Sequence, residues 1–209
     1  MRHEPTCPRC SGSVRAPGLW SSAWTCEQHG EVHPYHQLGA PSVELLDHVT
    51  ERASVPVWVP WPLPSGWIVT GVAYAGDERT GARATVVACS GPGLLGGPSD
   101  VLFVAEEPGV GLGARFAGIP STDPGVGFDL GAPHAKVEAA GHPTALWCLE
   151  TGGEPVSFVG EAKGLWLWSL VWPESAAVLM YDDLVLCDLR EMRELLPEVP
   201  VGALSPRLP

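Results

Sequence analysis

Short apolar runs, separated by glycine, proline and charged residues, make up most of the chain after residue 55. Runs of this length that are rich in β-branched residues and bounded by turn residues are typical of β-strands. The segment Gly-Asp-Glu-Arg-Thr-Gly at 76–81 predicts a hairpin loop between two of them. The pattern predicts strands over residues 67–75, 84–90, 101–105, 145–149, 156–159, 165–171, 176–181 and 184–189.

Helical spacing of apolar residues is clear in one segment, residues 43–53, and Ser42 before it is a suitable N-cap. One or two further helical turns are expected over residues 188–196, because the proline that follows would end them. Many short strands and few helices favour an α+β fold whose body is a mainly antiparallel β-sheet.

The most specific motif lies near the N-terminus, where Cys7-Pro-Arg-Cys10 is followed after fifteen residues by Cys26-Glu-Gln-His29. Two ligands separated by two residues lie on one tight turn, and two such turns can supply a tetrahedral metal site. The motif therefore predicts a structural Zn²⁺ ion held by Cys7, Cys10, Cys26 and His29. All four ligands would come from the protein, which leaves no open position for catalysis.

Spacing alone leaves the fourth ligand open. His33 is the principal alternative to His29, and His36 or His3 could also reach such a site. No cysteine or carboxylate stands at a matching distance from these extra histidines, so a second metal site is not expected.

These patterns divide the chain into three parts. Residues 1–36 are expected to form a metal-binding unit, residues 37–54 a linker with a short helix, and residues 55–209 a β-rich, Trp-rich acidic domain. The first part resembles a zinc ribbon, which implies a small metal-stapled fold of two hairpins.

The chain carries 12 basic and 24 acidic residues, a formal net charge of −12. Binding to nucleic acid or to an anionic membrane requires clustered Lys and Arg, and the basic residues here are scattered. The charge therefore argues against both. Because basic and acidic residues balance within residues 1–36, the excess negative charge lies in the rest of the chain and favours a protein partner with a basic surface.

Cysteine usage and the N-terminal pattern predict a cytoplasmic protein. Cys89, Cys148 and Cys187 stand singly in apolar stretches, as is usual in a reducing compartment. No apolar segment of the export-signal type precedes Cys7. The uncharged stretch at residues 53–76 contains several prolines, so we expect it to be buried and extended instead of spanning a membrane.

Tryptophan is unusually frequent, with nine residues. On a strand, Trp166, Trp168 and Trp172 share one face because side chains alternate, and this face is a candidate apolar ligand cleft. The alternative is that these large rings fill the core beneath the proline-rich segment 55–64. The size of the indole ring favours the core.

Two further segments carry residues of potential chemical interest. The glycine-rich stretch 109–118 lacks the Lys-Ser/Thr ending of a phosphate-binding loop and is predicted to be a strand or bulge, although its Arg115 could meet an anion. His134 and His142 flank a segment that is predicted to be a solvated loop.

Five motifs occur in order along the chain: Cys-Pro-Arg-Cys at 7–10, Val-Arg-Ala-Pro-Gly-Leu-Trp at 14–20, Val-Pro-Val-Trp-Val-Pro-Trp-Pro-Leu-Pro at 55–64, Gly-Leu-Trp-Leu-Trp at 164–168 and Leu-Met-Tyr-Asp-Asp-Leu-Val-Leu at 179–186. This set resembles an uncharacterised actinobacterial family. The resemblance implies no catalytic residue. Members are sometimes labelled phosphotransacetylases, but no alternating strand–helix pattern supports that label here.

The sequence favours a zinc-stabilised protein-binding or regulatory protein over an enzyme, because a closed metal site adjoins a body with no recognisable reactive set. The alternative is a small-molecule enzyme with a Trp-lined cleft, in which His134, His142, Asp182 or Asp183 would carry protons. Association with nucleic acid through the metal unit is a third and weaker hypothesis.

Overall fold

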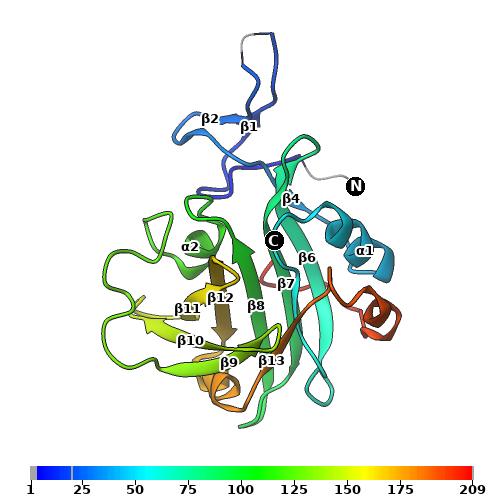
Figure 1. Ribbon diagram of the computed structural model, residues 1–209, viewed down its shortest axis with the longest axis vertical. Helices are drawn as coiled ribbons and strands as arrows, with labels where there is room; N and C mark the ends of the chain where they lie inside the picture. Colours follow the sequence, from blue (N-terminus) through cyan, green and yellow to red (C-terminus); the bar gives the residue numbers. More distant parts are fainter. Residues whose placement is uncertain (1–3, 20, 209) are drawn as a thin grey trace.

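A ten-stranded sheet forms the centre of the computed structural model, which describes residues 4–19 and 21–208 (Figure 1). The strand order is β4-β6-β7-β8-β12-β11-β10-β9-β13-β5, and every neighbouring pair is antiparallel except β9 and β13. The ten strands are β4 (Tyr35–Gln37), β5 (Trp58–Pro60), β6 (Ile68–Asp77), β7 (Gly81–Pro92), β8 (Pro98–Glu106), β9 (Ala135–Ala139), β10 (His142–Leu149), β11 (Val156–Ala162), β12 (Leu165–Trp172) and β13 (Val185–Asp188).

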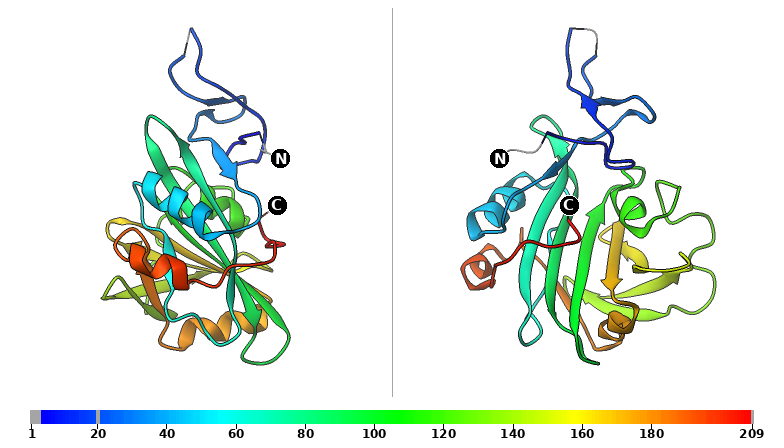
Figure 2. Two further views of the ribbon diagram at one scale, coloured as in Figure 1. Left: turned by 90° about the vertical axis from the view of Figure 1, so that its right-hand side faces the viewer. Right: turned by 180° about the vertical axis from the view of Figure 1, so that it is seen from behind.

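A small three-stranded sheet stands above one end of the large sheet and projects from it in all three views (Figures 1 and 2). It consists of β1 (Val14–Arg15), β2 (Thr25–Cys26) and β3 (Gly30–Glu31). From here on, the metal-binding unit means the described residues that precede β4, which are residues 4–19 and 21–34. The chain passes directly from this unit into β4, which pairs with β6 of the large sheet.

Four short helices complete the fold over the residues that the structure describes, and the predicted α+β class with a mainly antiparallel β body is confirmed. The predicted first helix forms as α1 (Val43–Arg52), where the Ser42 side chain accepts a hydrogen bond from the Leu45 N–H at 3.2 Å. The other helices are α2 (Leu112–Ala117) and two 3₁₀ helices, η1 (Glu174–Tyr181) and η2 (Arg193–Glu198).

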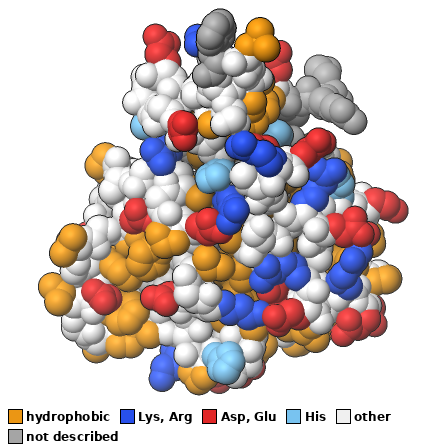
Figure 3. Space-filling model, turned by 45° about the horizontal axis from the view of Figure 1, so that its top comes forward, with side chains coloured by type: hydrophobic (Ala, Val, Ile, Leu, Met, Phe, Trp, Pro, Cys, Tyr) orange, Lys and Arg blue, Asp and Glu red, His pale blue; other side chains and the backbone are white. Residues whose placement is uncertain are grey.

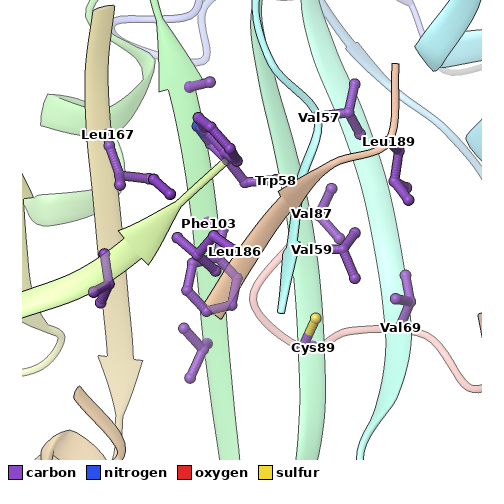
Figure 4. Packing of buried hydrophobic residues seen from close by; sticks show 14 of the residues in the cluster. Val57, Trp58, Val59, Val69, Val87, Cys89, Phe103, Leu167, Leu186 and Leu189 are labelled. Carbon is purple, nitrogen blue, oxygen red and sulfur yellow. The ribbon is translucent and has the colours of Figure 1, made fainter. Parts of the chain in front are cut away.

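The main core lies inside the curl of the large sheet. The end strand β5 packs against β7 and β8, so the sheet folds over its own apolar face. Trp58 from β5, Phe103 from β8 and Leu186 from β13 meet in this core (Figure 4). Burial of large apolar side chains of this kind contributes about 1.5–3 kcal/mol each. A second apolar cluster lies on the opposite face of β8 and β12, beneath α2.

The strand predicted over residues 176–181 is wrong, because this segment is the 3₁₀ helix η1. Its apolar residues form an uninterrupted run, and such a run does not distinguish a short strand from a buried helix. The helix begins after Pro173, whose carbonyl accepts a hydrogen bond from the Ala176 N–H at 2.8 Å. Ala176, Leu179 and Met180 then point toward the core at helical spacing.

The glycine-rich stretch 109–118 is also not a strand or bulge, because it contains α2. Gly111 and Gly118 border the helix with φ values of 84° and 72°, in the left-handed region that favours glycine. The segment flanked by His134 and His142, predicted to be a loop, instead forms β9 and the start of β10. Pairing with neighbouring strands decides its conformation, as the register of β9 with β10 shows.

Among the described residues, no helix has the length and apolar character needed to cross a membrane.

Candidate metal centre

The two turns of the N-terminal motif bring four ligand atoms together. The Sγ atoms of Cys7, Cys10 and Cys26 and a ring nitrogen of His29 all lie within 4.8 Å of one another. The His29 Nδ1 atom is 3.5 Å from Cys7 Sγ and 3.7 Å from Cys26 Sγ, and the Sγ atoms of Cys10 and Cys26 are 3.8 Å apart. These distances place the four side chains within reach of one metal ion.

Backbone hydrogen bonds shape the first of these turns. The Cys7 N–H donates to the Gly12 carbonyl at 2.8 Å, and the Ser11 N–H donates to the Cys7 carbonyl at 2.9 Å. The second turn begins at Cys26, which pairs with Val14 in β1 and with Gly30 in β3. The first turn thus precedes the small sheet, and the second turn joins two of its strands, β2 and β3.

The pKa values of Cys7 and Cys26 are shifted in opposite directions. Burial raises the pKa of Cys7 to about 11. Burial has the same effect on Cys26, but hydrogen bonds from the N–H groups of Gln28 and His29 outweigh it and lower the pKa of Cys26 to about 6. Because thiolates are the metal-binding form, a cation that enters this cluster must displace the Cys7 proton.

The alternative histidine ligands that the structure describes lie away from this cluster. His33 lines a cavity of about 360 Å³ between the metal-binding unit and the β6–β7 hairpin, and burial lowers its pKa. His36 stacks on Tyr74 with ring centroids 4.8 Å apart, and its Nε2 atom is 3.0 Å from the Gly76 carbonyl oxygen. His3 lies outside the described residues.

A family model described as "Family of unknown function (DUF6758)" matches residues 1–208. The chain belongs to this family. No curated protein and no solved structure matches it.

In this family member, two of the three tryptophans of β12, Trp168 and Trp172, lie in a packed core. Trp168 is fully buried and Trp172 is 8% exposed, and both belong to the apolar cluster beneath α2. Trp166 is half-buried, packs on Phe128 at 5.5 Å between ring centroids, and donates from Nε1 to Asp123 at 2.8 Å. The predicted common face therefore exists, and α2 covers much of it.

The four candidate proton carriers are all exposed. His134 and His142 lie on the β9–β10 hairpin, and Asp182 and Asp183 follow η1. The His134 Nδ1 atom accepts a hydrogen bond from the Cys148 N–H at 3.0 Å.

Sequence reasoning missed a fully buried carboxyl group at the end of β8. Glu106 is 0% exposed and accepts hydrogen bonds from the N–H groups of Leu112 and Gly113, at 2.7 and 3.2 Å. Burial raises its pKa to about 7, against the effect of these hydrogen bonds. In the sequence, Glu106 belongs to the acidic pair Glu106-Glu107, and such pairs are typical of exposed strand ends. No local signal shows that Glu106 is buried.

Charged side chains also gather where the metal-binding unit meets the body (Figure 3). From the unit, Arg9 donates to the carbonyls of Gly109 and Val110 at 2.6 and 3.2 Å. From the body, Arg115 donates to the Ser11 hydroxyl at 2.9 Å. One arginine of the unit and one arginine of the body therefore form hydrogen bonds that join the two parts.

Proposed function

We propose that this chain is a cytoplasmic, zinc-stabilised protein-binding protein, and that the tip of its metal-binding unit enters the partner. The proposal rests on one observation. Leu19 is exposed at the tip of the hairpin between β1 and β2, and the cluster of Cys7, Cys10, Cys26 and His29 holds the base of this hairpin. Cys89, Cys148 and Cys187 stand singly in apolar stretches of the sequence, which supports a reducing compartment.

The geometry of the cluster supports zinc. Zn–S and Zn–N bonds of about 2.3 and 2.0 Å at a tetrahedral angle separate two sulfurs by about 3.8 Å and a sulfur from a nitrogen by about 3.5 Å. The Cys10–Cys26 sulfur pair is 3.8 Å apart, and the Cys7–His29 pair is 3.5 Å apart. Three thiolates and one imidazole also match the preference of zinc for sulfur and nitrogen ligands.

The metal-binding unit needs such an ion because its own core is very small. Its strands are two residues long, and its buried apolar residues are Cys7, Cys26 and Val32 with Val14 packed against them. A core of this size does not balance the conformational entropy of the unit, whereas zinc binding contributes folding free energy directly.

The tip of the unit exposes an apolar side chain. Residues 15–19 are all exposed, and Leu19 is 98% exposed at a turn closed by the hydrogen bond from Gly18 N–H to the Ser21 carbonyl, 2.8 Å. The tip lies at the end of the molecule farthest from the large sheet (Figure 2). An apolar surface of a partner that covered this leucine would remove it from water, which is favourable. We infer a protein partner with an apolar pocket.

The experiment is capture from a lysate of the source organism with purified full-length protein as bait. We expect one stoichiometric partner with the wild type and its loss with Leu19→Asp. Leu95→Asp is the matched control, because Leu95 is 74% exposed on the loop between β7 and β8. Equal capture by the Leu19→Asp bait, or no stoichiometric partner with the wild type, would overturn the proposal.

A further inference from the structure

A second cavity, of about 500 Å³, lies where the metal-binding unit, β4, α2 and the C-terminal segment meet. Its volume is in the range of small-molecule sites. Its lining residues include Thr6, Tyr35, Gln37, Arg115, Phe116 and Arg207. Two guanidinium groups therefore reach one cavity in a chain with a formal net charge of −12.

Arg115 has no carboxylate within ion-pair distance among residues 4–19 and 21–208. Its Nη1 atom donates to the Ser11 hydroxyl at 2.9 Å, and its guanidinium lies 4.5 Å from the centroid of Tyr35 and 4.4 Å from that of Phe116. Cation–π contacts with these two rings fix the orientation of the guanidinium group. Burial lowers the pKa of Arg115, as expected for a cation that is partly removed from water without a counter-charge.

Arg207 is held at the same cavity by two contacts. Its Nε atom donates to Asp100 at 3.2 Å, and its guanidinium lies 5.0 Å from the centroid of Trp172. Neither Nη group has a hydrogen-bond partner among the described residues, so both remain available as donors. Gln37 is fixed nearby because its side-chain amide donates to the Leu208 carbonyl at 3.0 Å.

The Tyr35 hydroxyl is buried beside the Arg115 guanidinium, and it donates to no acceptor in the described part of the chain. The residue is 4% exposed and lines the cavity. Buried hydroxyl groups are nearly always paired, so an orphaned one beside a cavity indicates a missing acceptor. An oxyanion next to Arg115 would supply that acceptor.

We propose that this cavity binds a small molecule through an oxyanion group, either a carboxylate or a phosphate, that pairs with Arg115 and Arg207 and accepts a hydrogen bond from Tyr35. Guanidinium groups match both oxyanions because their planar N–H donors can bind two oxygens at once. The only carboxylate that lines the cavity in the described residues is that of Glu4, which is exposed.

The test uses the full-length, metal-loaded protein with inorganic phosphate and with acetate as probes, each titrated at constant ionic strength against chloride. We expect saturable thermal stabilisation by at least one probe, and the better probe identifies the ligand group. Arg115→Gln should weaken binding roughly tenfold or more, because it removes a charge-assisted pair. Arg79→Gln is the control, since it makes the same charge change at an exposed arginine of the β6–β7 loop.

Tyr35→Phe is the second variant, used because Arg115→Gln also removes the hydrogen bond to Ser11 and can fold poorly for that reason. Tyr35→Phe removes only the hydroxyl, so we expect unchanged stability without anion and binding weakened about threefold to tenfold. The proposal is overturned if neither probe gives saturable stabilisation, or if Arg115→Gln and Tyr35→Phe both respond to the better probe as the wild type does.

Discussion

Arg9 lies between the candidate metal ligands Cys7 and Cys10, and its Nη2 atom donates a hydrogen bond to the Gly109 carbonyl at 2.6 Å, 100 residues farther along the chain. This contact joins the first cysteine turn to the loop before α2. Together with the Arg115 contact to Ser11, it links the orientation of the metal-binding unit to a side chain that lies between two candidate metal ligands.

Arg9→Ala should therefore loosen the unit without removing the metal. Loss of a charge-assisted hydrogen bond in a partly buried site costs about 1–3 kcal/mol. We expect a decrease of that size in the free energy of unfolding, faster amide hydrogen exchange in residues 107–111, and unchanged metal content. Arg79→Ala, at an exposed site, should change none of these. Unaltered exchange in the loop of the Arg9 variant would show that the contact does not position the unit.

His29 and His33 give a direct comparison of the two principal candidate ligands. His29 Nδ1 lies 3.5 Å from Cys7 Sγ, whereas His33 lines a separate cavity. We expect His29→Ala to reduce the bound metal well below one equivalent and His33→Ala to retain one equivalent, measured by elemental analysis of protein purified without an affinity tag. Retention of metal by His29→Ala together with its loss from His33→Ala would assign the fourth ligand to His33.

Gly113 packs directly on the indole ring of Trp168. A Cβ atom at this position would lie well inside van der Waals distance of the Trp168 ring, which is fully buried. Overpacking of this kind costs about 1–3 kcal/mol. Gly113→Ala should lower the free energy of unfolding by that amount in denaturant titrations. Gly39→Ala is the control, because no atom lies within 4 Å of its added Cβ.

Glu106 makes stability depend on pH. Burial raises its pKa from 4.5 to about 7 in the folded protein, so the folded state holds the proton more tightly than the unfolded state. Protonation of Glu106 therefore adds to the free energy of unfolding. This contribution is fully present below about pH 4.5 and is lost as the pH rises through about 7. Relative to the wild type, Glu106→Gln should therefore gain about 2–3 kcal/mol in unfolding free energy between about pH 5 and about pH 8.

The measurement is denaturant unfolding of both proteins, each loaded with metal, across this pH range. Loss of metal at low pH affects both proteins equally and cancels in the difference. A difference in unfolding free energy that stays constant with pH would contradict the assignment of a raised pKa to Glu106.

Local signals were sufficient for several elements. The Ser42 cap and the apolar spacing after it predict α1, and its observed bounds of Val43–Arg52 differ by one residue from the prediction. The Cys-x-x-Cys and Cys-x-x-His turns are short-range features, so their spacing predicted the four residues that the structure brings together.

Elements whose conformation depends on distant partners were predicted less well. The glycine-rich segment becomes α2 because Glu106 accepts its first N–H groups from outside the segment. Residues 176–181 become η1 because their apolar side chains face the core at helical spacing, which a continuous apolar run conceals. Neither effect is encoded in the local pattern of hydrophobic and polar positions.

By itself, the sequence determined the β-rich class, the first helix, the acidic balance and the candidate metal ligands, because each depends on composition or on residues close together in the chain. Only the tertiary structure decided that Arg9 meets Gly109, that Glu106 is buried, and that Arg115 and Arg207 reach one cavity. These relationships join residues up to about a hundred positions apart, and the curl and register of the sheet bring them together.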